Sequence, residues 1–134
     1  MHEWALAEAV VSAVSDMAEK EGLKTVSAIN LKLGELQQID LGIFKFAFSQ
    51  LFSGKLKDAR VNVTKIRARL KCRSCGHKWP FSKNGLDEPA KEAIHFVPEI
   101  VHVYVRCPVC GSRDFEVERG RGVWIQSIKG EKKT

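Results

Sequence analysis

The chain has 134 residues, of which 44% are hydrophobic, and its formal net charge is +6. This length suits one compact unit or two small ones that share a core, and its longest apolar runs are far shorter than the about 18 residues that span a membrane. The N-terminus has no basic region followed by an apolar stretch, so we expect no signal peptide and a soluble, cytoplasmic protein.

The first half of the sequence alternates between helical and strand periodicity. Residues 3–21 place apolar side chains three or four positions apart and are followed by Gly22, a typical helix C-cap. Residues 25–36 alternate apolar and polar side chains, which predicts a half-buried strand. Asp40 is a good N-cap for a second helix that ends near Ser53-Gly54. The apolar stripe of that helix comprises Phe44, Ala47, Phe48 and Leu51.

Two further strands are expected on either side of a segment with a different composition. Residues 60–70 alternate, but the apolar phase shifts between Val63 and Ile66, as a β-bulge or a change of environment within the strand would cause. Residues 120–130 supply the last strand. The segment between them is rich in Cys, Gly, Pro and charge, and its piece VHVYV, which includes His102, alternates like a strand.

This order of elements predicts an α+β fold. We expect a small mixed sheet with two helices, in the order α-β-α-β…β, and an inserted zinc-ribbon-like domain. Residues 1–70 plus 120–130 are assigned to the α/β unit and residues 71–119 to the inserted zinc-binding domain. Residues 131–134 are expected to form a disordered tail.

The strongest signal is a pair of matching motifs, CRSCG and CPVCG, whose CxxC pairs are separated by 31 residues. Two residues between thiolates let one tight turn present both sulfurs to one ion, and the following glycine permits the positive φ that closes the turn. Disulfides do not suit a chain without a secretory signal, and a redox motif needs only one such pair. We therefore expect a closed, structural zinc site formed by Cys72, Cys75, Cys107 and Cys110.

The excess positive charge lies in the second half, where residues 68–134 hold thirteen Lys/Arg against eight Asp/Glu. The basic run from Lys65 to Lys78, with Trp79 and Phe81 as stacking platforms, would also suit a zinc-ribbon nucleic-acid-binding protein. More commonly such aromatic residues form the small core of a zinc module. Nucleic acid binding is therefore the alternative hypothesis. The sequence shows no nucleophile–base arrangement or phosphate loop, so we do not expect an enzyme.

Surface or packing roles are the first interpretation for three of the four histidines, namely His77, His95 and His102. His2 differs, because a histidine near a chain start can bind a metal through its imidazole and through deprotonated backbone nitrogens. A planar set of nitrogen ligands favours Ni(II) or Cu(II), whereas Zn(II) prefers a tetrahedron.

The sequence resembles the nickel-insertion accessory proteins of NiFe-hydrogenase maturation, the HypA/HybF family. The matching pieces run from residue 1 to about residue 128, and IHFVPEIVH resembles the archaeal branch. They are MHE, LGEL, FAFSQLFSG, CRSCG, CPVCG and RGVWIQSI. The resemblance implies a non-enzymatic nickel metallochaperone with structural zinc on the four cysteines and Ni(II) as transient cargo.

The resemblance also implies a set of nickel ligands and partners. Nickel would be bound by the imidazole of His2 together with the backbone nitrogens of His2 and Glu3. In archaeal-type members the histidine of the IHF segment, here His95, completes a square plane. The implied partners are a nickel-insertion GTPase, which docks near the N-terminal helix, and the hydrogenase large subunit; some members also serve urease. Membrane and nucleic acid are not expected partners.

Overall fold

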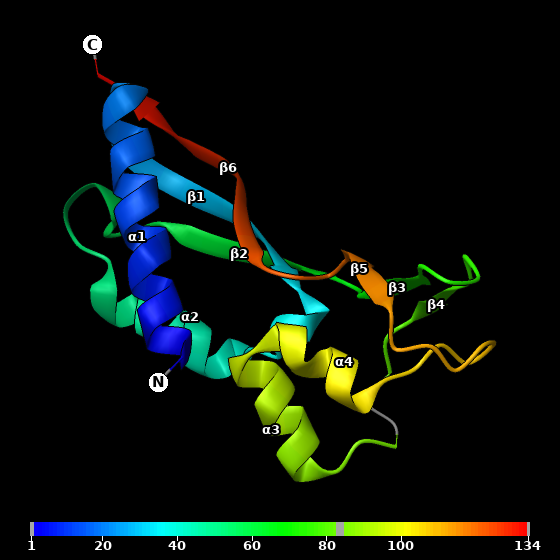
Figure 1. Cartoon of the computed structure of the whole chain (residues 1–134). Coiled ribbons are helices and arrows are strands. Elements are labelled where there is room, and N and C mark those ends of the chain that lie inside the picture. Colours follow the sequence, from blue (N-terminus) through cyan, green and yellow to red (C-terminus); the bar gives the residue numbers. More distant parts are fainter. Residues whose placement is uncertain (1, 83–84, 134) are drawn as a thin grey trace. The chain divides into compact units, whose positions relative to one another are not determined.

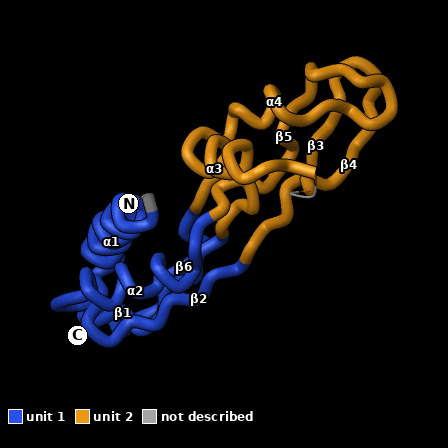
Figure 2. Tube along the Cα trace, turned by 90° about the horizontal axis from the view of Figure 1, so that it is seen from below, with its two compact units in different colours: residues 1–32, 39–64, 124–134 blue, residues 33–38, 65–123 orange. Residues whose placement is uncertain are grey.

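The computed structural model describes residues 2–82 and 85–133, and its backbone contacts divide the chain into two compact units (Figure 2). Unit 1 comprises residues 1–32, 39–64 and 124–134, and unit 2 comprises residues 33–38 and 65–123. The chain therefore crosses between the units four times.

Unit 1 contains two long helices and a three-stranded sheet with strand order β2-β1-β6 (Figure 1). This arrangement confirms the predicted α-β-α-β…β order. Its elements are α1 (His2–Lys20), β1 (Leu23–Gly34), α2 (Leu41–Leu51), the 3-10 turn η2 (Gly54–Leu56), β2 (Arg60–Ile66) and β6 (Val123–Lys132).

The helix ends of unit 1 follow the predicted caps. The Asp40 carboxylate accepts a hydrogen bond from the backbone N–H of Ile43 at 3.0 Å, which caps α2. Gly22 follows α1 with φ +67°, in the left-handed conformation that glycine adopts readily. Three of the four predicted stripe residues of α2 are buried, and the fourth is half-buried. The apolar spacing in the sequence thus identified the helix face that enters the core.

Unit 2 is built around a second three-stranded sheet, of order β4-β3-β5, in which β3 is antiparallel to both neighbours. Its elements are η1 (Glu35–Gln37), β3 (Arg69–Cys72), β4 (Lys78–Pro80), α3 (Glu88–Phe96), η3 (Pro98–Ile100), α4 (Val101–Tyr104) and β5 (Phe115–Arg119). The buried core of this unit consists of Leu36, Ala68, Leu70, Phe81, Ile94, Val101 and Phe115.

Two expectations about strands were wrong. The predicted strand 60–70 is two strands in different sheets, because β2 ends at Ile66 and β3 begins at Arg69, so the phase shift marks a change of sheet. The predicted strand VHVYV, including His102, is instead the short helix α4. Val101 is buried and Val103 is exposed, so burial there does not follow the period of two that the alternating sequence suggested.

The end of the chain also differs from the expected disordered tail of residues 131–134. Strand β6 continues to Lys132, and the backbone N–H of Lys133 donates to the carbonyl oxygen of Gly22 at 2.9 Å. These backbone hydrogen bonds order residues 131–133 although their side chains are exposed, while Thr134 lies outside the described residues.

Residues 34–38 are held closely against the loop that leads from β5 to β6. The N–H of Gly34 donates to the carbonyl of Gly122 at 2.8 Å, and the N–H of Leu36 donates to that of Gly120 at 2.9 Å. A Cβ atom at Gly34 would overlap the backbone of Gly120, and one at Gly120 would overlap Ala68. Glycine is required at both positions because two backbones meet there.

Replacing Gly34 by alanine should therefore destabilise the protein. We expect Gly34→Ala to lower the free energy of unfolding by about 1–3 kcal/mol, because the new methyl group forces the backbones apart. Urea denaturation measures the change. Gly42→Ala is the control, because its Cβ would meet only the Asp40 carboxylate, at 3.3 Å. Equal stability of the two variants would contradict the close approach.

Candidate metal centre

The four cysteines converge on one point in unit 2. Their sulfur atoms all lie within 4.8 Å of one another, with Sγ–Sγ distances of 3.5 Å between Cys72 and Cys110 and 3.6 Å between Cys75 and Cys107. Tetrahedral zinc with Zn–S bonds of about 2.3 Å separates its sulfurs by about 3.8 Å. A disulfide needs about 2 Å. All four cysteines are free, so the arrangement fits one shared ion and not disulfides.

The two CxxCG motifs form equivalent turns. The N–H of Gly76 donates to the carbonyl of Cys72 at 3.0 Å, and the N–H of Gly111 donates to that of Cys107 at 2.9 Å. Both glycines have positive φ, +78° and +76°, as the motifs predicted. In each turn the first cysteine is buried and the second exposed.

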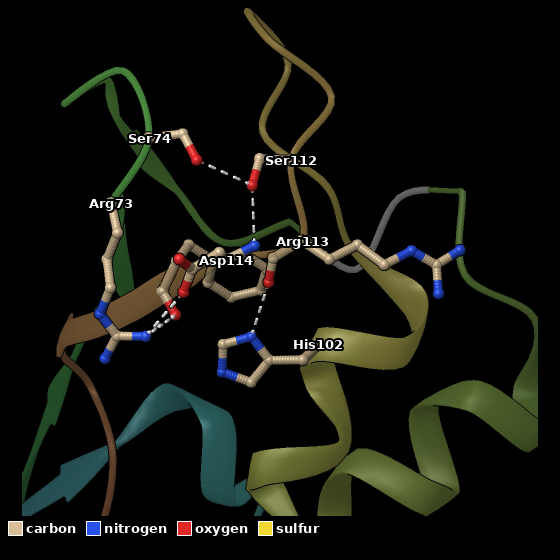
Figure 3. A network of polar contacts seen from close by, with 7 residues as sticks. Arg73, Ser74, His102, Ser112, Arg113 and Asp114 are labelled. Carbon is tan, nitrogen blue, oxygen red and sulfur yellow. Dashed lines mark hydrogen bonds and ion pairs between the residues drawn. The ribbon is translucent and has the colours of Figure 1, made fainter.

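A polar network joins the two turns through protein groups (Figure 3). The Ser74 hydroxyl lies 3.2 Å from that of Ser112, which accepts the backbone N–H of Asp114 at 3.0 Å. The Arg73 guanidinium donates to the Asp114 carboxylate at 3.1 Å, and the Arg73 N–H donates to the Asp114 carbonyl at 2.9 Å. The turns therefore have direct connections besides a shared ion.

The surroundings differentiate the four thiols. The backbone N–H of Cys75, which stabilises the Cys72 thiolate, is the main reason that the pKa of Cys72 is lowered to about 6. At Cys110 the N–H of Ser112 lowers the pKa, but the Cys72 side chain, desolvation and the other sulfurs outweigh it and raise the pKa to about 12. The surroundings thus favour the thiolate at Cys72 and the protonated thiol at Cys110, whose proton zinc must displace.

The aromatic and basic residues beside the centre have structural roles. Phe81 is buried in the core of unit 2, and Trp79 meets Phe115 edge-on at a centroid distance of 5.5 Å. The His77 ring stacks on Trp79 at 5.9 Å, and His77 is not among the residues whose ligand atoms converge. Lys78 forms an ion pair with Glu118 at 2.9 Å. These contacts agree with the packing interpretation of Trp79 and Phe81.

The other predicted metal ligands are found on separate units. His2 begins α1 in unit 1, and its side chain lies outside the described residues. Glu3 follows in the first turn of α1 and is buried, with 6% of its surface exposed. His95 lies in the last turn of α3 in unit 2, where its Nδ1 is 2.9 Å from the carbonyl oxygen of Gln37. The structure therefore brings together the four cysteines but does not test the nickel set.

Two polar contacts of this unit were missed by sequence reasoning. Ser112 joins the zinc turns through its hydroxyl, and Gln37 contacts His95 through its backbone carbonyl. A serine directly after CxxCG is a weak signal, because Ser is common in turns. A backbone carbonyl leaves no signal at all, since every residue has one.

Comparisons with known proteins agree with this geometry. The profile of the family described as "Hydrogenase/urease nickel incorporation, metallochaperone, hypA" matches residues 1–130. The chain is 50% identical to the hydrogenase maturation factor HypA of Pyrococcus furiosus and 49% identical to that of Thermococcus gammatolerans, in each case over 98% of this chain and 97% of the relative.

The fold is also found among solved structures. The solution structure of the Ni metallochaperone HypA from Helicobacter pylori has a TM-score of 0.66 over 99% of this chain and all of that chain, at 21% sequence identity. None of the helices in residues 2–82 and 85–133 is long and apolar enough to cross a membrane. From the family match, the two archaeal relatives and the four-cysteine centre, we conclude that this chain belongs to the HypA family of nickel metallochaperones, which are not enzymes.

Proposed function

We propose that this chain binds Ni(II) at the start of α1 and delivers it to the large subunit of a hydrogenase. The observation that carries this proposal is that α1 begins at His2. The amides of His2 and Glu3 therefore belong to the first turn, whose N–H groups have no acceptor within the helix. Deprotonated amide nitrogens beside an imidazole form the planar nitrogen set that Ni(II) favours. Burial of Glu3 supports an ordered first turn.

His95 is our candidate for a further nickel ligand. Its imidazole would add one nitrogen donor to those of His2 and Glu3. His2 belongs to unit 1 and His95 to unit 2.

We assign zinc to the four cysteines as a structural ion, in the insert of residues 71–119 predicted from the sequence. Four thiolates close the coordination shell of zinc and leave no position for substrate. The site would stabilise unit 2, because its two turns are far apart in the sequence.

The proposed partners are a nickel-insertion GTPase and the hydrogenase large subunit, acting in the cytoplasm. The sequence has no phosphate-binding loop of its own, so nucleotide energy would come from the partner. In unit 1 the exposed residues Ile43 and Phe46 of α2 offer an apolar surface, and the Phe46 ring meets Trp4 of α1 edge-on at 6.1 Å. This surface supports docking of the GTPase near the N-terminal helix.

Nickel binding should depend on His2. We expect His2→Ala to weaken Ni(II) affinity by at least about 100-fold, since it removes a ligand and not a neighbour of one. The variant should also lose the d–d absorption band of square-planar nickel. Nickel titration followed by visible spectroscopy measures both effects, and His77→Ala serves as the matched control. Unchanged affinity in His2→Ala would contradict the proposed site.

Zinc binding should depend on each sulfur but not on the network that joins the turns. Cys110→Ser should lower zinc affinity by more than about 100-fold, whereas Ser112→Ala should change it by less than about 10-fold. Competition with a chromophoric chelator measures the affinities. X-ray absorption should count four sulfurs on zinc in the unmodified protein. Three sulfurs, or full zinc affinity in Cys110→Ser, would refute a closed four-thiolate site.

The pH dependence of zinc affinity should differ between two cysteine variants. Protons compete with zinc for sulfur, so affinity falls as pH falls for every thiol whose pKa lies above the pH. The pKa of Cys110 is about 12, so this thiol contributes throughout the neutral range, whereas Cys72, with a pKa of about 6, contributes only below that value.

Between about pH 6.5 and pH 8, Cys110→Ser should therefore give a shallower slope of log zinc affinity against pH than the unmodified protein. Cys72→Ser should leave the slope nearly unchanged, although both variants bind zinc more weakly. Equal slopes for the two variants would contradict the different pKa values of the two thiols.

A further inference from the structure

We propose that the backbone carbonyl of Gln37 is a positioning group for nickel binding, because it fixes the tautomer of His95 so that Nε2 carries the lone pair. This inference rests on the proposed role of His95 as a nickel ligand. It concerns a group outside the ligand set, which acts on nickel only through the imidazole.

The chemistry of the contact determines the direction of the hydrogen bond. His95 Nδ1 lies 2.9 Å from the Gln37 carbonyl oxygen, and a carbonyl oxygen can only accept. Nδ1 must therefore carry the proton. In the neutral ring the lone pair then belongs to Nε2, the nitrogen on the far side from Gln37. A metal-binding histidine usually donates its other ring N–H to a carbonyl or carboxylate in this way.

The carbonyl itself is held by the peptide segment around it. The side-chain oxygen of Gln37 accepts the backbone N–H of Gly122 at 3.1 Å, and the preceding residue, Leu36, donates its N–H to the Gly120 carbonyl at 2.9 Å. The following residue, Gln38, has φ +48°, the left-handed conformation that closes the 3-10 turn η1. Contacts on both sides thus fix the direction in which the Gln37 carbonyl points.

The imidazole is held from the helix side as well. Ile94, its neighbour in α3, is completely buried in the core of unit 2. The Phe96 ring meets the His95 ring edge-on, with centroids 5.2 Å apart and an interplanar angle of 68°. A fixed helix end and a fixed carbonyl leave the ring little freedom to rotate, which lowers the entropy lost when a metal is bound.

A second histidine in the same unit provides an internal reference. His102 Nδ1 lies 3.2 Å from the carbonyl oxygen of Arg113, so it must have the same tautomer (Figure 3). Its ring stacks on Phe115 with centroids 4.1 Å apart, and its Nδ1 contacts Arg113 and not Gln37. A change confined to Gln37 should therefore alter His95 and leave His102 as it was.

The first experiment reads the tautomer directly in the nickel-free protein, with the zinc site loaded. Long-range proton–nitrogen NMR at a pH where the imidazole is neutral distinguishes a protonated from an unprotonated ring nitrogen. We expect a protonated Nδ1 and an unprotonated Nε2 for both His95 and His102. In Gln37→Ala the bond to Gly122 is lost, so His95 should shift toward the Nε2–H tautomer while His102 keeps its signals.

The second experiment connects the tautomer to nickel. Gln37→Ala should weaken Ni(II) affinity by about 10-fold, the lower end for a group that orients a ligand. In a His95→Ala background, Gln37→Ala should not weaken Ni(II) affinity further, because the imidazole through which Gln37 acts is absent. Gln126→Ala, an exposed glutamine of β6, is the matched control and should leave the affinity unchanged.

The outcomes separate this inference from the proposed function. If His95→Ala weakens nickel binding but His95 shows the Nε2–H tautomer, the positioning role of Gln37 is wrong and the ligand role of His95 stands. If His95→Ala binds nickel like the unmodified protein, the ligand role fails and the hydrogen bond is structural. Equal losses from Gln37→Ala with and without His95 would also refute the positioning role.

Discussion

The structure of unit 2 depends on two cysteine turns that are 31 residues apart in the sequence and meet at one point. Strands β3 and β5 bring them together, because Cys72 is the register partner of Phe115, just beyond the second turn. The residues between the two turns must then leave the first turn and return to the second, which lies close to it. They do so as α3, η3 and α4, whose buried side chains Ile94 and Val101 complete the core beneath the sheet.

The short segment of residues 34–38 is the second constraint. Its backbone is bonded to Gly120 and Gly122, and its Glu35 carboxylate accepts the backbone N–H of Ala68 at 2.7 Å. Two loops and the helix α3, all distant in the sequence, thus contact these five residues. The carbonyl that contacts His95 belongs to this segment, so the position of that imidazole depends on these contacts.

The sequence predicted the features that have a local cause. Both helices of unit 1, the Asp40 cap, the glycines of the zinc turns and the four converging cysteines follow from spacing and side-chain chemistry. Features caused by tertiary contacts were missed. Residues 101–104 alternate like a strand but form a helix. Residues 60–70 look like one strand because no glycine or proline marks the change of sheet, and the shift in apolar phase alone did not distinguish it from a bulge. The contacts of His95 and Ser112 depend on partners that no motif specifies.

The hydrogen bonds between the zinc turns have a consequence for metal selection. The link from Ser74 through Ser112 to Asp114 joins the two turns independently of a metal, and the sulfurs themselves all lie within 4.8 Å of one another. The four sulfur donors suit the tetrahedron that zinc adopts, whereas Ni(II) favours a planar set of nitrogens. Donor type and geometry together would therefore sort the two metals between the cysteine centre and the nickel set that we propose.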